Sequence, residues 1–224
     1  MHETLKKLEN GLVVSCQSLA PLNEPRITGL MAQAAVMAGA HGIRACRPEN
    51  IRAVRALVGI PIVGIYKQEH DGFEIYITPT VESALAAVDA GADIVGMDGS
   101  PRPRPDGSSF KDLVDAVHDR GALVMADIST REEGLFSAEA GADIIASTLS
   151  GYTPQSVKTP GPDLDLVEFL VKETGKPVNA EGRYHTPEDV AAAFARGAFM
   201  VSIGAAITEP QFLTKKFLAT VPKK

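Results

Sequence analysis

A carboxylate, a glycine and an arginine stand in three consecutive positions, Glu181, Gly182 and Arg183, directly after the apolar run Val178–Ala180. A carboxylate at the end of a buried strand is costly unless it has a partner or a chemical role. Glycine lets a backbone N–H approach a ligand closely, and arginine suits an anionic ligand. The stretch is therefore a candidate acid/base and anion-binding site, and an ordinary surface turn is the alternative.

Other apolar runs of the chain also end in residues that can do chemistry. Gln17, Lys67 and Asp127 directly follow three of these runs, Arg44 lies within another, and Gly204 follows the last. If the runs are parallel strands of one closed barrel, their carboxyl ends meet at a single face, where barrel active sites are found. We therefore expect these five residues to surround one pocket together with the Glu-Gly-Arg stretch.

Lys67 and Glu181 follow the third and seventh runs, which lie opposite each other in a ring of eight. An amine and a carboxylate on opposite walls can flank a planar carbanion-type intermediate, one on each face, and so remove a proton and return it with inversion. A salt bridge across the pocket is the alternative. Asp127 can orient Lys67, bind substrate hydroxyls or cap the next helix, and the sequence leaves these roles open.

Two dipeptides that begin with glycine suggest how an anion is held. Gly182–Arg183 and Gly204–Ala205 follow the seventh and eighth runs, where barrels of this kind hold phosphate with backbone N–H groups and a helix N-terminus. Arg44 and Arg183 are the candidate charge partners. Glycines also follow strands for purely geometric reasons, but the combination favours a phosphorylated small molecule as the substrate.

Metal and cofactor motifs are missing from the sequence. The five histidines are scattered without paired ligand spacing: His2, His41, His70, His118 and His185. There is no Gly-x-Gly-x-x-Gly motif and no Walker-type loop. We therefore expect a reaction that uses neither a metal nor a cofactor.

One short sequence pattern recurs along the chain. Versions of one junction, a helix that ends in glycine followed by an apolar run, occur around Gly39, Gly91, Gly141 and Gly197, at intervals of 50 to 56 residues. One interval is too long for a single strand–helix unit of roughly 30 residues but fits two. Four pairs of units predict eight strands.

The expected strands are short, continuous apolar runs, as is typical of parallel strands covered on both faces. They are Leu12–Cys16, Gly42–Ala45, Ile62–Tyr66, Ile94–Met97, Leu123–Ala126, Ile144–Ser147, Val178–Ala180 and Met200–Ile203. Helices are expected near 26–38, 48–58, 80–89, 109–119, 131–139, 163–173, 187–195 and 209–219. The pattern predicts a single (β/α)8 TIM barrel domain over residues 1–224 with a short N-terminal helix. A doubly wound sheet is the alternative, but it does not require eight evenly spaced repeats.

Composition limits the partners. A net charge of −6 with no basic face argues against nucleic acid and anionic membranes. No apolar stretch approaches the length of a membrane span, and the run after Lys6-Lys7 lacks a convincing cleavage site, so we expect a cytoplasmic protein. The two cysteines, Cys16 and Cys46, are too few for a disulfide scaffold.

Five phrases of the sequence together resemble the N-acetylmannosamine-6-phosphate 2-epimerases. They are Val63–Lys67, Ile75–Thr80, Met125–Thr130, Thr148–Thr153 and Ala180–Arg183, and the match runs in order over almost the whole chain. The resemblance implies a barrel that interconverts N-acetylmannosamine 6-phosphate and N-acetylglucosamine 6-phosphate during sialic-acid breakdown.

The resemblance also implies residue roles. Lys67 would abstract the proton at carbon 2, and Glu181 would be its acid/base partner. The positions that the family uses around the substrate are Gln17, Arg44, Asp127, Gly182, Arg183 and Gly204. There is one departure: the family often has arginine in the turn after the eighth strand, where this chain has Glu209. We therefore expect phosphate binding to depend more on the other arginines and on backbone N–H groups.

Three other functions fit a phosphate-binding barrel. In a lyase or aldolase, Lys67 would form a Schiff base with a sugar-acid phosphate. An isomerase of phosphorylated biosynthetic intermediates and a non-enzymatic sugar-phosphate sensor are the other two, since this architecture hosts many chemistries. The opposed Lys67 and Glu181 argue against the sensor, which needs no acid and base.

Two further expectations concern local structure. For Lys67 to act as a base, we expect it in a dry pocket beside Arg44 or Arg183, with the carboxylates held off by substrate. We expect Thr208–Leu218 to form a helix with Thr208 and Gln211 as a capping box. Its apolar residues, together with the family resemblance, favour a homodimer.

Overall fold

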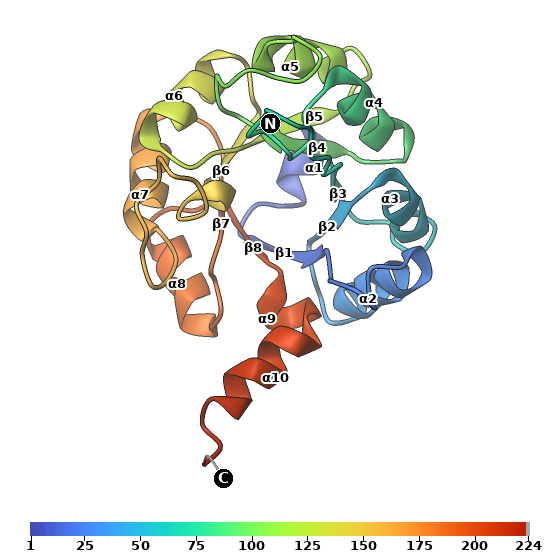
Figure 1. The fold of residues 1–224 in the computed structure, drawn as a ribbon, viewed down its shortest axis with the longest axis vertical. Helices are drawn as coiled ribbons and strands as arrows, with labels where there is room; N and C mark the ends of the chain where they lie inside the picture. Colours follow the sequence, from blue (N-terminus) through green and yellow to red (C-terminus); the bar gives the residue numbers. More distant parts are fainter. Residues whose placement is uncertain (223–224) are drawn as a thin grey trace.

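The computed structural model, which describes residues 1–222, is a closed barrel of parallel strands surrounded by helices (Figure 1). The strands pair in sequence order, and β8 closes the ring by pairing with β1. The eight strands are β1 (Gly11–Cys16), β2 (Gly42–Cys46), β3 (Ile62–Ile65), β4 (Ile94–Asp98), β5 (Leu123–Asp127), β6 (Ile144–Ala146), β7 (Val178–Glu181) and β8 (Met200–Ile203). The predicted TIM barrel is confirmed. The predicted domain, 1–224, extends into 223–224, which lie outside the described residues.

The helices follow the strands as predicted, with small differences at their ends. They are α1 (Glu3–Lys6), α2 (Pro25–Met37), α3 (Pro48–Arg55), α4 (Val81–Asp89), α5 (Phe110–His118), α6 (Arg131–Glu139), the 3-10 helix η1 (Ser147–Leu149), α7 (Leu164–Glu173), α8 (Pro187–Ala195), α9 (Ala205–Thr208) and α10 (Pro210–Leu218). The start of α8 shows how the sequence sets such an end. Thr186 and Asp189 form a capping box there, and Pro187 occupies the first turn.

Side chains that alternate along the strands build two separate cores. Those that point outward pack beneath the surrounding helices, as Val14 and Ile43 do. Those that point inward fill the lower half of the barrel, where Val13 and Met125 meet Leu8, which follows α1. The amino end of the barrel is therefore closed by apolar packing, and the carboxyl end is left for polar residues.

The connection after β3 carries a small hairpin that the sequence did not predict. Lys67 pairs antiparallel with Ile77, the Gln68 N–H donates to the Tyr76 carbonyl at 2.9 Å, and the Asp98 N–H donates to the Ile77 carbonyl at 3.0 Å. The hairpin over residues 66–78 thus returns across the end of β4. It brings Tyr76 and Ile77 to the mouth of the barrel next to Lys67.

The C-terminal segment fastens the last strand to the first and then leaves the barrel. The Thr208 hydroxyl donates to the Ser15 carbonyl at 2.8 Å, across 193 residues of sequence. Thr208 ends α9, and Glu209 precedes α10 without a side-chain cap, so the predicted Thr208–Gln211 capping box is wrong. The reason is that the hydroxyl is already bonded to backbone carbonyls. Helix α10 projects away from the barrel, and none of its residues is buried (Figure 1).

Candidate active site

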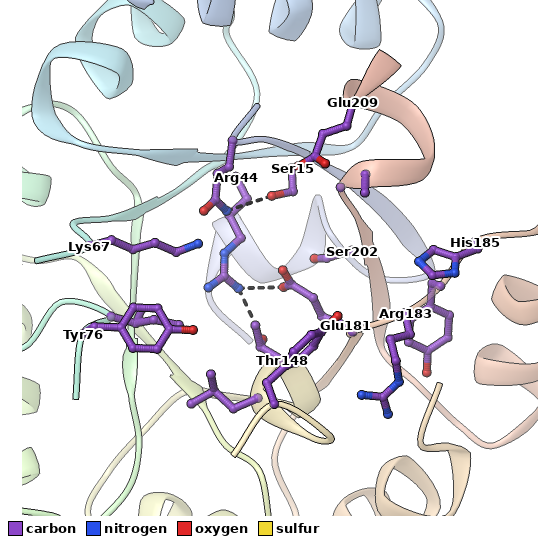
Figure 2. Close-up of a pocket in the computed structure, with 18 residues that line it drawn as sticks. Ser15, Arg44, Lys67, Tyr76, Thr148, Glu181, Arg183, His185, Ser202 and Glu209 are labelled. Atoms are coloured by element: carbon purple, nitrogen blue, oxygen red, sulfur yellow. Dashed lines mark hydrogen bonds and ion pairs between the residues drawn. The ribbon is translucent and has the colours of Figure 1, made fainter. Parts of the chain in front are cut away.

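A cavity of about 290 Å³ opens at the carboxyl ends of the strands (Figure 2). Its lining includes seven of the eight predicted site residues: Gln17, Arg44, Lys67, Glu181, Gly182, Arg183 and Gly204. The eighth, Asp127, is fully buried at the end of β5 and bonds to the Arg44 side chain. The strand ends thus bring the predicted residues together although they are spread over most of the chain.

Arg44 lies at the centre of the site and holds two carboxylates. Its Nη1 donates to Glu181 Oε2 at 2.6 Å and to Asp127 Oδ1 at 3.0 Å, while Nη2 donates to Asp127 Oδ2 at 2.5 Å. Burial disfavours the charged guanidinium, but Asp127 and Glu181 overcome this and raise the pKa of Arg44. The expected role of Arg44 was to meet a phosphate. In the structure its bonds instead go to the two carboxylates.

Asp127 acts on the site through Arg44. Its Oδ1 also accepts a hydrogen bond of 2.6 Å from the Thr148 hydroxyl. The helix-cap role considered for Asp127 is wrong, because Thr130 caps α6 by accepting from the Glu133 N–H. The two hydrogen bonds that Arg44 donates to Asp127 fix the plane of the guanidinium, and with it the position of Glu181.

Glu181 is held by one of its two oxygens. Oε2 accepts from Arg44 and from Asn179 Nδ2 at 3.0 Å, and the Ser202 hydroxyl donates to Asn179 Oδ1 at 2.9 Å. Burial raises the pKa of Glu181, and Asp127 adds to this, while Arg44 acts in the opposite direction. A raised pKa favours the protonated carboxyl group, which is the form that can donate a proton.

Sequence reasoning did not assign a role to Asn179. The available signal was its position two residues before Glu181 in the same strand, because residues i and i+2 share a strand face. An amide in an otherwise apolar strand facing the barrel interior requires a polar partner. That partner is the carboxylate itself.

Lys67 reaches into the pocket from the side opposite Glu181, with Arg44 between them in the view (Figure 2). Its side chain is exposed, so the expectation of a dry pocket around this lysine is wrong. The reason is that Lys67 lies beyond the end of β3, on the hairpin at the open mouth. The alternative of a salt bridge between Lys67 and Glu181 also fails, because the carboxylate pairs with Arg44.

Arg183 contacts the long connection between β6 and α7. It donates through Nε to the Gly161 carbonyl at 2.7 Å, through Nη2 to the Thr159 hydroxyl at 2.9 Å, and through Nη1 to the Ser150 carbonyl. Its guanidinium also lies 5.5 Å from the centre of the Tyr152 ring. Arg183 was expected to pair with phosphate. The structure gives its donors to this connection, whose Leu149 and Tyr152 form part of the pocket wall.

The backbone on the β7–β8 side of the pocket is tightly packed. Gly182 has φ +103°, and a β-carbon there would lie 3.3 Å from the Thr148 carbonyl oxygen. Only glycine suits this backbone conformation without strain. Gly204 and Ala205 follow β8 on the same side, and Gln17 donates to the Ser15 hydroxyl at 2.8 Å beside them. Beside this backbone, the side chains of Tyr184, His185 and Glu209 complete the lining on this side of the pocket.

Comparison with known proteins identifies the family. Residues 28–223 match the family model described as "Putative N-acetylmannosamine-6-phosphate epimerase". A relative from Caldanaerobacter subterraneus, named for the same 2-epimerase activity, is 42% identical over 99% of this chain and 95% of its own length. One from Clostridium perfringens is 43% identical over 95% of this chain and 97% of its own length. The chain belongs to this epimerase family.

Solved structures agree with the family assignment. The N-acetylmannosamine-6-phosphate 2-epimerase from Clostridium perfringens matches with a TM-score of 0.95 and 42% identity, covering 98% of this chain and 97% of that one. A thiamine phosphate pyrophosphorylase from Pyrococcus furiosus matches with a TM-score of 0.65 at 16% identity, a likeness of fold alone. The epimerase family, and not merely the barrel, is therefore shared.

Two properties of this family member concern other classes of site. Across residues 1–222, no group of three or more His, Cys, Asp or Glu side chains is arranged to hold a metal ion. Within the same range, no helix has the length and apolarity needed to span a membrane.

Glu209, the residue that departs from the family pattern, lines the same pocket as Gly204 and is half-buried.

Proposed function

We propose that this protein interconverts N-acetylmannosamine 6-phosphate and N-acetylglucosamine 6-phosphate by removing and returning the proton at carbon 2, in the breakdown of amino sugars and sialic acid. Membership of the epimerase family supports the reaction class. The observation that carries the proposal is the opposed pair, Lys67 from the β3 side and Glu181 from β7, in one pocket. Inversion at a carbon requires proton transfer on both of its faces.

The proton transfers balance with these two groups alone. The step acts on the ring-opened sugar, which carries an aldehyde at carbon 1. In its amine form, Lys67 takes the proton from carbon 2, and the electron pair of the C–H bond moves onto the oxygen of this carbonyl. Glu181, as the carboxylic acid, then delivers a proton to the opposite face of the planar intermediate. The reverse reaction exchanges the roles of the two groups. Arg44 and Asn179 hold Glu181 Oε2, so proton transfer at Glu181 is assigned to Oε1.

The 6-phosphate is proposed to lie on the β7–β8 side, against the backbone of Gly182 and Gly204. The small residues there leave room for a close approach of backbone N–H groups. Arg183 adds positive charge at the edge of the same pocket while it holds the β6–α7 connection. Glu209 adds negative charge to the lining, which weakens binding of an anion relative to an arginine at that position.

We also propose a cytoplasmic homodimer. Helix α10 has no buried residue, and its Phe217 and Leu218 are 71% and 60% exposed. An exposed apolar surface of this kind on a protruding helix is typical of a subunit contact. A second copy of the chain is the proposed partner. We place the enzyme in the cytoplasm because a doubly charged sugar phosphate does not cross a lipid bilayer unaided.

The reaction is tested by proton NMR of N-acetylmannosamine 6-phosphate with the enzyme in D₂O. We expect N-acetylglucosamine 6-phosphate that carries deuterium at carbon 2, and no adduct on Lys67 when borohydride is added with substrate. Lys67→Ala should remove both epimerisation and exchange. A reduced adduct on Lys67, or a product with a cleaved carbon–carbon bond, would instead assign the protein to the aldolase class.

A further inference from the structure

The pocket has one apolar corner. Among the described residues that line it, the aliphatic side chains larger than alanine are Ile77 and Leu149, and these two belong to one cluster with Ile65. Ile77 comes from the hairpin after β3, and Leu149 from η1 after β6. The rings of Tyr76 and Tyr152 flank them on the same two connections. Within the described lining, aliphatic side chains larger than alanine are thus confined to one side of the mouth, beside the ends of β4 and β5, whereas the rings of Tyr184 and His185 follow β7.

The opposite side of the pocket has a different character. It is lined by Ser15 of β1, by Gly204 and Ala205, which follow β8, and by the polar side chains of Gln17 and Glu209. In the closed ring, the gap between β8 and β1 lies directly across from the gap between β4 and β5. The line that joins the apolar corner to the small, polar side therefore crosses the line that joins Lys67 to Glu181.

A 2-acylamino sugar 6-phosphate fits these two crossed lines. The acid and base must lie above and below carbon 2, so the plane of the reacting atoms lies across the line from Lys67 to Glu181. At the planar carbon 2, the acylamino group and the carbon chain that ends at the phosphate leave in different directions. If the phosphate lies at Gly204, the acyl group is directed to Ile77 and Leu149.

We propose that Ile77 and Leu149, with the Tyr76 ring beside them, form the subsite for the alkyl part of the 2-acyl group and set the length of acyl chain that the enzyme accepts. The proposal rests on the proposed epimerase reaction and extends it to the substrate class. The expected substrates are 6-phosphates of hexosamines with a short N-acyl group. The free amine, which is cationic and has no alkyl group to bury, is excluded.

The corner is rigid enough to measure chain length. Ile77 and Leu149 are each 2% exposed. The Ile77 carbonyl accepts from the Asp98 N–H at 3.0 Å, and the Leu149 N–H donates to the Ile128 carbonyl at 3.1 Å. Both residues are thus tied to the ends of neighbouring strands. An acyl chain with additional methylenes must displace packed side chains, which is costly in a close-packed interior.

The test compares kcat/KM for N-acetyl-, N-propanoyl- and N-butanoylmannosamine 6-phosphate and for the free amine. For the wild-type enzyme, kcat/KM should fall about tenfold or more for each methylene beyond acetyl. Tenfold is the lower end of the discrimination that a hydrophobic pocket gives for one methylene. Leu149→Ala should raise the butanoyl-to-acetyl ratio by about tenfold or more, because the removed side chain makes room for two methylenes. Leu135→Ala, on the outer face of α6 and 37% exposed, is the control and should leave the ratio unchanged.

Leu149→Val and Ile77→Val, which remove less volume, give the same comparison should Leu149→Ala fail to fold. An unchanged acyl ratio in every folded variant, with wild-type epimerisation of the N-acetyl substrate intact, would overturn the subsite and leave the epimerase standing. Absence of wild-type epimerisation for every acyl length would instead overturn the proposed function. The two failures are therefore distinguishable.

Discussion

Arg44 Nη1 lies 2.6 Å from Glu181 Oε2, and Nη2 of the same guanidinium lies 2.5 Å from Asp127 Oδ2. One cation thus joins two carboxylates from strands on the far side of the barrel. Arg44 and Asp127 are buried, and the Glu181 side chain is 13% exposed toward the pocket. The Glu181 carboxylate owes its position to this bridge. The catalytic proposal depends on that position.

Arg44→Ala should be strongly destabilising, because it leaves two buried carboxylates without their counter-charge. Breaking a buried pair of this kind costs about 3–5 kcal/mol. Arg44→Lys keeps the charge but loses the fork, so it should lower both the free energy of unfolding and kcat/KM to a smaller extent. Urea unfolding measures the first effect. Arg196→Ala, which removes the half-exposed pair with Glu168, is the control, and a loss equal to that of Arg44→Ala would contradict the argument.

Glu181 should make stability depend on pH in a particular direction. Burial raises its pKa, so the folded protein binds this proton more tightly than the unfolded chain does. The contribution of Glu181 to stability is fully present below its ordinary value, about 4.3, and falls as the pH rises through the raised pKa of the folded state. Glu181→Gln removes this loss. The free energy of unfolding of the variant should therefore increase relative to that of the wild type as the pH rises. A difference between the two proteins that does not depend on pH would refute the assignment.

The Arg183 side chain should order the connection between β6 and α7. Arg183→Ala removes three hydrogen bonds to this connection, so we expect faster amide hydrogen exchange over residues 150–161 and a higher KM. Gly151→Ala should have the same effect. Its β-carbon would lie 1.9 Å from Arg183 Nη1, and φ at this position is +81°. Gly107→Ala, in a turn with a similar φ of +76° but no atom within 4 Å of the added carbon, separates backbone strain from displacement of Arg183.

Removal of the 6-phosphate from the substrate should lower kcat as well as raise KM, because remote binding energy positions the reacting carbon. Two charge-assisted hydrogen bonds of about 1.5 kcal/mol each correspond to a loss of roughly a hundredfold. Steady-state kinetics with N-acetylmannosamine and its 6-phosphate measure the ratio. Comparable values for the two sugars would exclude a phosphate subsite at Gly182 and Gly204.

The apolar surface of α10 should hold two chains together. Phe217→Glu places a charge in the proposed contact, so we expect it to convert a dimer near 47 kDa, about twice the chain mass of 23.7 kDa, to a monomer at micromolar concentration. Sedimentation velocity distinguishes the two. Met37→Glu, at an 84% exposed apolar residue on α2, is the matched control. A wild-type monomer would reject the interface.

The repeated glycine junctions were sufficient to predict the barrel, because each one marks the same local event, a helix end followed by a buried strand. The barrel in turn was sufficient to bring Lys67 and Glu181 to one pocket. The partners of Asp127 were not predictable, since Arg44 is 83 residues away and three roles suit a carboxylate at a strand end. The hairpin that carries Tyr76 was also missed, because it pairs through a single bridge and lies outside the eight evenly spaced strand–helix units.

The last hydrogen bonds of the barrel have a consequence for synthesis of the protein. β1 pairs with β8, and Thr208 bonds to Ser15 only after nearly the whole chain is available. Until then β1 and β7 are the edge strands of an incomplete sheet and present unpaired backbone, which is the part of a sheet most prone to join other chains. A nascent chain that has already made Lys67 and Arg44 therefore has no enclosed pocket. On the ribosome, activity should appear in a single late step, when the eighth strand emerges and takes its place between the seventh and the first.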